Sequence, residues 1–167
     1  MTEKDHDEEL KSFENYIANG DEFMEEEEWA LAIREYDKSI QELEDLRETN
    51  PGVFENDEVD LEWTLSRTFH KRSNAHFSKM DTQKALMDIN AAVKLDPEEP
   101  MIWNTMGLLY LQMRRFKKAA EYFGKASQLD PDEGLYHHNM GVAFQDDGND
   151  AVAKRCFKKS EELGYDL

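Results

Sequence analysis

The amino-acid sequence repeats itself with a period of 34 residues over its last two thirds. Three consecutive segments, residues 66–99, 100–133 and 134–167, align with one another without a gap. A period of roughly 20 to 50 residues is typical of proteins that stack copies of one supersecondary unit, because each unit buries its apolar face only against its neighbours. The repeat therefore predicts a quasi-linear stack of similar units.

The aligned columns agree in residue type at the spacing expected of a pair of helices. Two columns hold small residues, which let helix backbones approach closely: Ser73, Gly107 and Gly141, then Ala85, Ala119 and Ala153. Other columns hold larger side chains that would fill the volume around that crossing: Phe69, Trp103 and His137; His76, Tyr110 and Phe144; Ile89, Phe123 and Phe157. Asp-Pro pairs at 96–97 and 130–131 end one helix and open the next turn. Each repeat is therefore expected to form one helix pair.

An earlier copy of the pattern spans residues 13–46, and an insertion at 47–65 separates it from the second copy. We expect Leu43 and Leu46 to prolong the second helix. The third helix should begin early, and the apolar residues of the insertion should pack on that extension: Val59, Leu61, Trp63 and Leu65. The helices expected from the whole pattern span residues 7–26, 28–48, 57–79, 82–95, 100–113, 116–129, 134–147 and 150–163.

This pattern resembles the tetratricopeptide repeat column for column, and its length matches the period of that family. The resemblance implies an all-α fold, a right-handed α-solenoid of four helix pairs in a single domain over residues 1–167. Its second and third helices should be longer than usual because of the insertion. The resemblance also implies a protein-interaction module in which the first helix of each pair lines a concave groove for a peptide segment.

Groove contacts in that family come from helix positions that are not used for packing. The matching positions are Arg67, His70, Lys71, Asn74, Met101, Asn104, Leu108, Leu111, Leu135, His138, Asn139 and Val142, and the first repeat adds Glu14, Ile17, Ala18, Asp21 and Met24. Their asparagines can bond a peptide backbone, and their apolar members offer pockets. Arg67, His70 and Lys71 form a small basic patch. We therefore expect a ligand segment with apolar anchors and one acidic group.

The best-known ligand mode of the family grips the C-terminal carboxylate of chaperones that end in EEVD. That clamp uses five lysine, asparagine and arginine positions, which in this sequence hold Ile17, Asp21, Lys71, Met101 and Thr105. None of the five matches, and Asp21 would repel a carboxylate. A frame that begins one repeat later keeps a single match. We predict that the chain lies outside this subgroup.

Catalytic and metal-binding patterns are absent from the sequence. His70 and His76 are six residues apart on one expected helix and point to different faces. The stretch at 146–150 lacks the alternating ligands of a calcium loop and is expected to be a turn around Gly148. We expect no enzyme activity, no cofactor and no metal. The single Cys156 fits a reducing compartment, no apolar run reaches membrane length, and a cytoplasmic location is expected.

The net charge of −18 is concentrated at one end of the sequence. Residues 1–62 hold 23 acidic and 5 basic residues, whereas residues 63–167 hold 15 of each. This balance argues against a nucleic-acid partner. The acidic part is either a solvated face or a surface that attracts a basic partner. The favoured function is an adaptor, scaffold or cochaperone-like module; the alternatives are a self-associating homo-oligomeric scaffold and a regulatory subunit of an enzyme.

Overall fold

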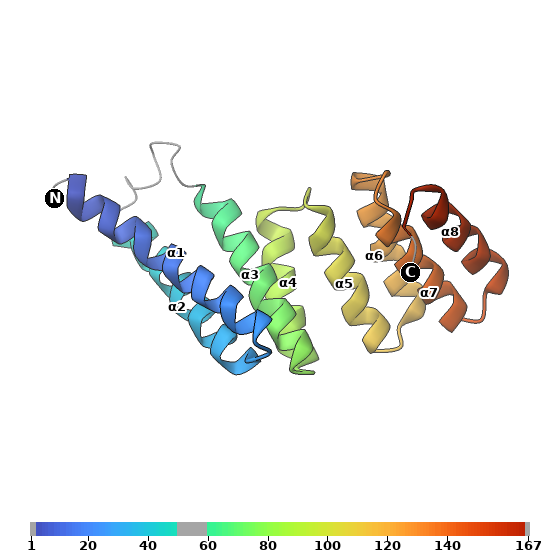
Figure 1. Cartoon of the computed structure of the whole chain (residues 1–167), viewed down its shortest axis with the longest axis horizontal. Coiled ribbons are helices and arrows are strands. Elements are labelled where there is room, and N and C mark those ends of the chain that lie inside the picture. Colours follow the sequence, from blue (N-terminus) through green and yellow to red (C-terminus); the bar gives the residue numbers. More distant parts are fainter. Residues whose placement is uncertain (1–2, 50–59, 166–167) are drawn as a thin grey trace. The chain divides into compact units, whose positions relative to one another are not determined.

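The computed structural model describes residues 3–49 and 60–165, with side chains from residue 12 onward. Over these residues the chain is all-α, with eight helices and no strand (Figure 1). The helices are α1 (Glu3–Glu25), α2 (Trp29–Thr49), α3 (Leu61–Ser78), α4 (Thr82–Leu95), α5 (Pro100–Gln112), α6 (Phe116–Leu129), α7 (Gly134–Asp146) and α8 (Asp150–Glu162). The predicted helices are confirmed, with shifts of a few residues at their ends.

The chain divides into two compact units, Met1–Asp96 and Pro97–Leu167. Unit 1 contains the hairpins α1/α2 and α3/α4, and α2 packs against α3. Unit 2 contains the hairpins α5/α6 and α7/α8, and α6 packs against α7. The expected organisation as a single domain stays a prediction.

Small residues let the helices of each hairpin cross closely, as the aligned columns predict. A Cβ atom added to Gly107 of α5 would lie 2.5 Å from the ring of Phe123 on α6. The same construction at Gly141 of α7 comes within 2.6 Å of Phe157 on α8. In the second repeat Ser73 occupies this column, and its hydroxyl donates to the carbonyl of Ala85 at 2.9 Å. The small-residue columns therefore set the distance between the paired helices.

The turn within each pair contains one residue with a positive φ angle. These residues are Glu27 (60°), Met80 (63°), Arg114 (57°) and Gly148 (78°). Residues 147–149 are therefore a turn, as expected for this stretch of the sequence. In each hairpin the second helix begins two residues after the residue with positive φ. The four hairpins therefore share one turn geometry.

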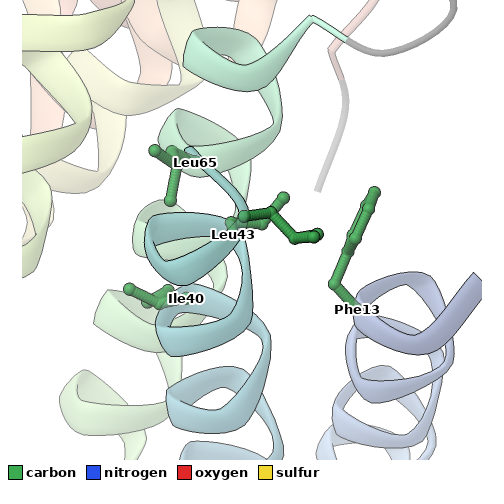
Figure 2. Close-up of a cluster of buried hydrophobic side chains, with 5 residues drawn as sticks. Phe13, Ile40, Leu43 and Leu65 are labelled. Atoms are coloured by element: carbon green, nitrogen blue, oxygen red, sulfur yellow. The ribbon is translucent and has the colours of Figure 1, made fainter. Parts of the chain in front are cut away.

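The insertion lengthens α2 and α3 to 21 and 18 residues, compared with 14 residues in α4. Phe13, Ile40, Leu43, Leu46 and Leu65 form the buried core between α1, α2 and α3 (Figure 2). Leu61 packs against the edge of this cluster. Long second and third helices are confirmed. Residues 50–59, which include Val59, lie outside the described part of the chain.

The prediction that Trp63 packs on the extension of α2 is wrong. Trp63 is 47% exposed, whereas Leu65 is 3% exposed. Successive residues of a helix are about 100° apart, so Leu61 and Leu65 share one face while Trp63 points away from it. The helical period therefore turns Leu61 and Leu65 inward and Trp63 outward.

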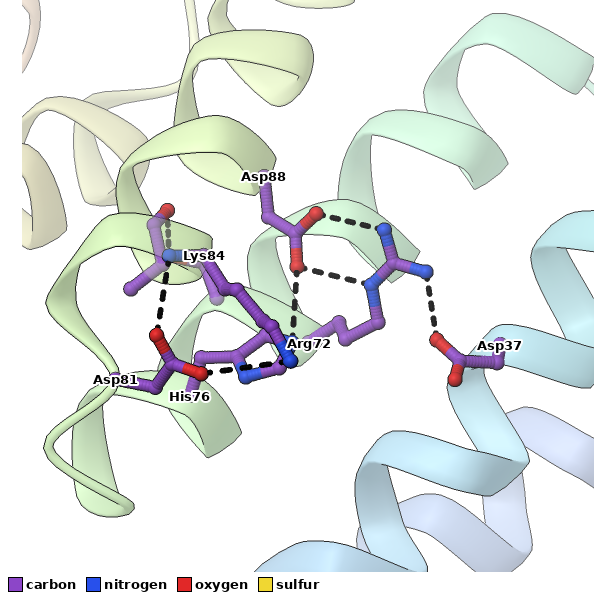
Figure 3. A network of polar contacts seen from close by, with 8 residues as sticks. Asp37, Arg72, His76, Asp81, Lys84 and Asp88 are labelled. Carbon is purple, nitrogen blue, oxygen red and sulfur yellow. Dashed lines mark hydrogen bonds and ion pairs between the residues drawn. The ribbon is translucent and has the colours of Figure 1, made fainter.

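A polar network joins α2, α3 and α4 in unit 1 (Figure 3). The Arg72 guanidinium donates to both carboxylate oxygens of Asp88, at 2.9 and 2.6 Å, and to Asp37 at 2.7 Å. His76 lies beside it, with Nε2 3.9 Å from Asp88 and with its buried Nδ1 lacking a hydrogen-bond partner among the described residues. Burial lowers the pKa of His76, so its ring is neutral at pH 7. His76 is thus a buried core residue in the column where the repeat places an aromatic.

Candidate functional site

Unit 1 is hollowed between α1 and α3, and we call this hollow the unit 1 groove. Its lining from α1 is Phe13, Glu14, Ile17, Ala18 and Asp21, and its lining from the α3 side is Asp60, Trp63, Thr64, Arg67, Thr68 and Lys71. Both sets recur every three or four residues, so each forms a stripe on one face of its helix. Arg67 and Lys71 are predicted groove residues, and four of the five predicted contacts from α1 lie opposite them. The fifth, Met24, packs against the buried cluster of Ala32, Tyr36 and Ala75 instead.

The floor of the groove uses its polar atoms internally. The Thr68 hydroxyl donates to the carbonyl of Thr64 at 2.8 Å, and the Thr64 hydroxyl donates to the carbonyl of Asp60 at 2.7 Å. On the α1 side Phe13 is buried and Ile17 is half-buried. The floor therefore offers mainly apolar contacts to a ligand.

Trp63 and Arg67 form one wall of the groove. They stand one helical turn apart on α3, and the guanidinium carbon of Arg67 lies 4.3 Å from the centre of the indole ring. Asp60 caps α3 by accepting from the backbone N–H of Trp63 at 3.0 Å. This capping fixes the start of the helix and places the exposed indole beside the groove.

An ion pair crosses the groove further along the helices. The Lys71 ammonium donates to both carboxylate oxygens of Asp21, at 2.7 and 2.8 Å. Asp21 also accepts from the Tyr36 hydroxyl at 2.8 Å. Burial, together with this bond to Asp21, raises the pKa of Tyr36, which stays protonated as a donor. Asp21 therefore holds α1 to both α2 and α3.

The predicted basic patch carries less charge than its composition implies. Burial and the neighbouring Lys71 charge lower the pKa of His70 to about 4, so the ring is neutral at pH 7. The Lys71 charge is paired with Asp21. Within the described residues Arg67 has no carboxylate partner, and it is the cation of the patch that stays open to a ligand.

The predicted groove residues of unit 2 lie in different surroundings. The Asn139 amide donates to the side-chain oxygen of Asn104 at 2.8 Å. Leu108 and Leu111 pack against the core of α6. The ring of His138 lies 5.3 Å from both Phe157 and Tyr165. Met101 is exposed, whereas the remaining positions of the predicted set are half-buried: Asn74 in unit 1, and Leu135 and Val142 in unit 2.

Trp63, Asp60 and the two threonines line the unit 1 groove but were not among its predicted contacts. A signal for them exists in the sequence. Extending the stripe of Lys71 and Arg67 backward by one turn reaches Trp63, and a further turn approaches the capping Asp60. The 34-residue frame of the repeat begins at residue 66, so it leaves Asp60, Trp63 and Thr64 in the insertion.

Neither a metal centre nor a membrane span is found among the described residues. In this part of the chain, no group of three or more histidine, cysteine or acidic side chains is placed to hold a metal ion. No described helix combines the length and apolar character needed to span a bilayer.

Paired helices with close small-residue crossings and a hollow between successive first helices define a class of helical-repeat proteins. Residues 100–133 match the family model described as Tetratricopeptide repeat, with the boundaries predicted for the third repeat. This stretch of the chain is thus similar to one tetratricopeptide repeat. A comparison with curated proteins gave no match.

Solved structures of this fold are similar to the chain over most of its length. BtubC (BKLC) from P. vanneervenii has a TM-score of 0.74 at 15% identity, covering 93% of this chain and 66% of that one. The MamA RS-1 ArsTM double mutant has a TM-score of 0.71 at 20% identity, with 91% and 75% covered. The second TPR of Spaghetti (RPAP3), bound to the HSP90 peptide SRMEEVD, has a TM-score of 0.57 at 18% identity, with 59% and 92% covered.

Proposed function

We propose that this chain is a non-catalytic adaptor or scaffold that binds a peptide segment of a partner protein in the unit 1 groove. The observation that carries the proposal is the exposed indole of Trp63, which lines a hollow together with Ile17 and Ala18. Exposed tryptophans in concave apolar sites are frequent anchors of binding energy. A bulky apolar side chain of the ligand would pack between this indole and the α1 stripe.

The charges of the groove favour an acidic group next to that anchor. Arg67 is held over the Trp63 ring and has no carboxylate partner among the described side chains. A ligand carboxylate beside the indole would pair with it directly. Lys71 would join only after its bond to Asp21 is loosened, so its contribution is expected to be smaller.

The similar Spaghetti domain supports a peptide as the ligand class, because that solved structure contains one. We propose that the segment bound here differs from an EEVD tail, since Ile17 and Asp21 occupy two of the clamp positions. The predicted positions of unit 2 are proposed to contact a partner as well. A cytoplasmic location is part of the proposal and fits the single cysteine.

Selection from a random peptide-display library with the full chain as bait tests this function. We expect selected peptides to share a bulky apolar residue with an acidic neighbour. Binding measured by fluorescence anisotropy should weaken at least about tenfold for Trp63→Ala and for Ile17→Glu, because each removes apolar contact at the anchor. Arg67→Glu combined with Lys71→Glu should also weaken binding, because the new glutamates repel the acidic group of the peptide.

Leu31→Glu is the matched control, because Leu31 is 37% exposed on α2 and does not line the groove. Its affinity should equal that of the unchanged chain. Equal binding by the groove variants and the control would overturn the proposal, as would a library that yields no binding peptide. Circular dichroism spectra of the variants should match that of the unchanged chain, which checks that each variant is folded.

A further inference from the structure

A cluster of positive charge occupies the turn between α5 and α6. We call Arg114, Arg115, Lys117 and Lys118 the basic turn; all four are exposed. The chain has 38 acidic and 20 basic residues, so four cations within five positions run against its composition. In the part of the chain that the structure describes, none of the four forms an ion pair. Two of them instead lie over aromatic rings, Arg114 over Phe116 at 5.7 Å and Lys118 over Tyr110 at 5.4 Å.

The turn between α1 and α2 carries the opposite charge. Residues 25–28 are four consecutive glutamates, which we call the acidic turn, and all of them are exposed. No ion pair of the described residues involves any of these glutamates. Lys79 and Trp29 border the shallow hollow beside them. A similar hollow beside the basic turn is bordered by Phe116 and Asp147.

The two turns occupy the same position in their hairpins. Glu27 and Arg114 are the residues with positive φ, at 60° and 57°. Each is followed by one charged residue and then by the aromatic that begins the next helix, Trp29 or Phe116. The turns are therefore matched in backbone shape, each has an aromatic ring at its base, and they differ in charge. Opposite charges on complementary surfaces select partners and guide their encounter.

We infer that this chain self-associates, with the acidic turn of one copy contacting the basic turn of a second copy. A second copy carries the same net charge of −18, so the contact depends on the local complementarity of the two turns and not on long-range attraction between the chains. An acidic run that fits the basic turn is present on the chain itself. Each copy carries both turns, so a closed two-fold dimer makes the contact twice and an open head-to-tail array makes it once per interface.

This inference goes beyond peptide binding in the unit 1 groove and concerns separate residues. The two turns also supply matched substitutions for each other. Arg114→Glu with Arg115→Glu places glutamates where the first hairpin already has Glu27 and Glu28. Glu27→Arg with Glu28→Arg makes the reverse exchange. Each change uses residue types that this turn geometry already holds, so folding should be retained.

Sedimentation velocity of the full chain over a wide range of concentrations tests the inference. The unchanged chain should show a sedimentation coefficient that rises with concentration. Each double variant alone should lose this rise, because reversing two of the four charges leaves the altered turn with no net charge. An equimolar mixture of the two variants should regain it, since the unaltered acidic turn of one variant can then contact the unaltered basic turn of the other.

Lys154→Glu with Arg155→Glu on α8 is the control of equal charge change, and it should associate like the unchanged chain. The groove variant Ile17→Glu should also associate normally, which separates this inference from the proposed function. A chain that stays monomeric at every concentration would overturn the inference. So would variants that associate as the unchanged chain does, or a monomer whose basic turn binds duplex DNA or phosphatidylserine vesicles instead.

Discussion

Lys71 on α3 donates to both carboxylate oxygens of Asp21 on α1, at 2.7 and 2.8 Å. The pair crosses the unit 1 groove and takes a cation away from any ligand. Asp21 has a second donor, the hydroxyl of the buried Tyr36. The carboxylate is thus shared between an exposed ion pair and a buried hydroxyl, and these two roles have different energetic weight.

Two substitutions at Asp21 separate these roles. Asp21→Asn keeps an acceptor for Tyr36 and removes the ion pair, whose partners are 43% and 28% exposed. Exposed pairs contribute at most about 1 kcal/mol, so the free energy of unfolding should fall by that amount or less. Asp21→Ala also leaves the Tyr36 hydroxyl without its acceptor, which costs a further 1–3 kcal/mol or so. Urea denaturation measures both; equal losses would show that the hydroxyl bond contributes nothing.

The network around Arg72 offers a second contrast (Figure 3). The Asp88 side chain is 8% exposed and binds Arg72 through two bonds, whereas the Asp37 side chain is 56% exposed and binds it through one. Asp88→Ala should lower the free energy of unfolding by about 3 kcal/mol, because it leaves a half-buried guanidinium poorly paired. Asp37→Ala should cost less than about 1 kcal/mol. Denaturation midpoints compare the stabilities of the two variants. Similar losses of stability would contradict the larger contribution expected of Asp88.

The sequence predicted the helices and their crossings because the 34-residue repeat reports the packing columns directly. Gly107 and Phe123 could be assigned to one crossing from their columns alone. Trp63 could not be placed, because the insertion has no second copy to align with and its alternating apolar residues suggested burial. The helical period decides which of these residues face the core, and the alternating apolar pattern in the sequence does not reveal it.

Charges in the groove were harder to predict than shape. Arg67, His70 and Lys71 form a cationic group in the sequence, but their states depend on neighbours from other helices. Asp21 is 50 residues away from Lys71 along the chain. Burial removes the charge of His70. The register between α1 and α3 decides these pairings, and the insertion conceals that register.

His70 makes stability depend on pH. Burial lowers its pKa to about 4 in the folded chain, below the ordinary value of 6.5. The unfolded chain therefore binds a proton more readily between these values, and the contribution of the neutral ring is present above pH 6.5 and is lost as the pH falls toward 4. Unfolding free energy should drop by roughly 1–2 kcal/mol between pH 6.5 and pH 5.

Histidine resonances followed by NMR give the pKa of His70 directly. His70→Gln should reduce the pH dependence of urea denaturation over the same interval, while the lowered pKa of His76 leaves part of it. A His70 midpoint near 6.5 would contradict the buried neutral state.

The close approach of the helices at Gly107 predicts that Gly107→Ala lowers stability, whereas helix propensity alone predicts that it raises stability. Alanine favours a helix over glycine by about 1 kcal/mol. At this position, however, a Cβ atom would lie 2.5 Å from the Phe123 ring. Gly107→Ala should therefore destabilise the chain by about 1–3 kcal/mol through overpacking. Gly124→Ala on α6 is the control, since the nearest atom to its new Cβ is the Met140 sulfur at 3.9 Å. Thermal unfolding should show opposite shifts for these two changes.

Arg115 stands at the N-cap of α6 without a side-chain hydrogen bond to the helix. In the last hairpin the equivalent position is Asn149, whose side chain accepts from the N–H of Val152. A capping side chain contributes about 1 kcal/mol, and a cation at a helix N-terminus opposes the helix dipole. Arg115→Asn should therefore raise the free energy of unfolding by about 1 kcal/mol, and Asn149→Ala should lower it by a similar amount.

The same Arg115→Asn chain should associate more weakly in sedimentation, because the basic turn has lost one charge. Stability and association would then change in opposite directions, which is expected if Arg115 serves an interface rather than the helix it precedes.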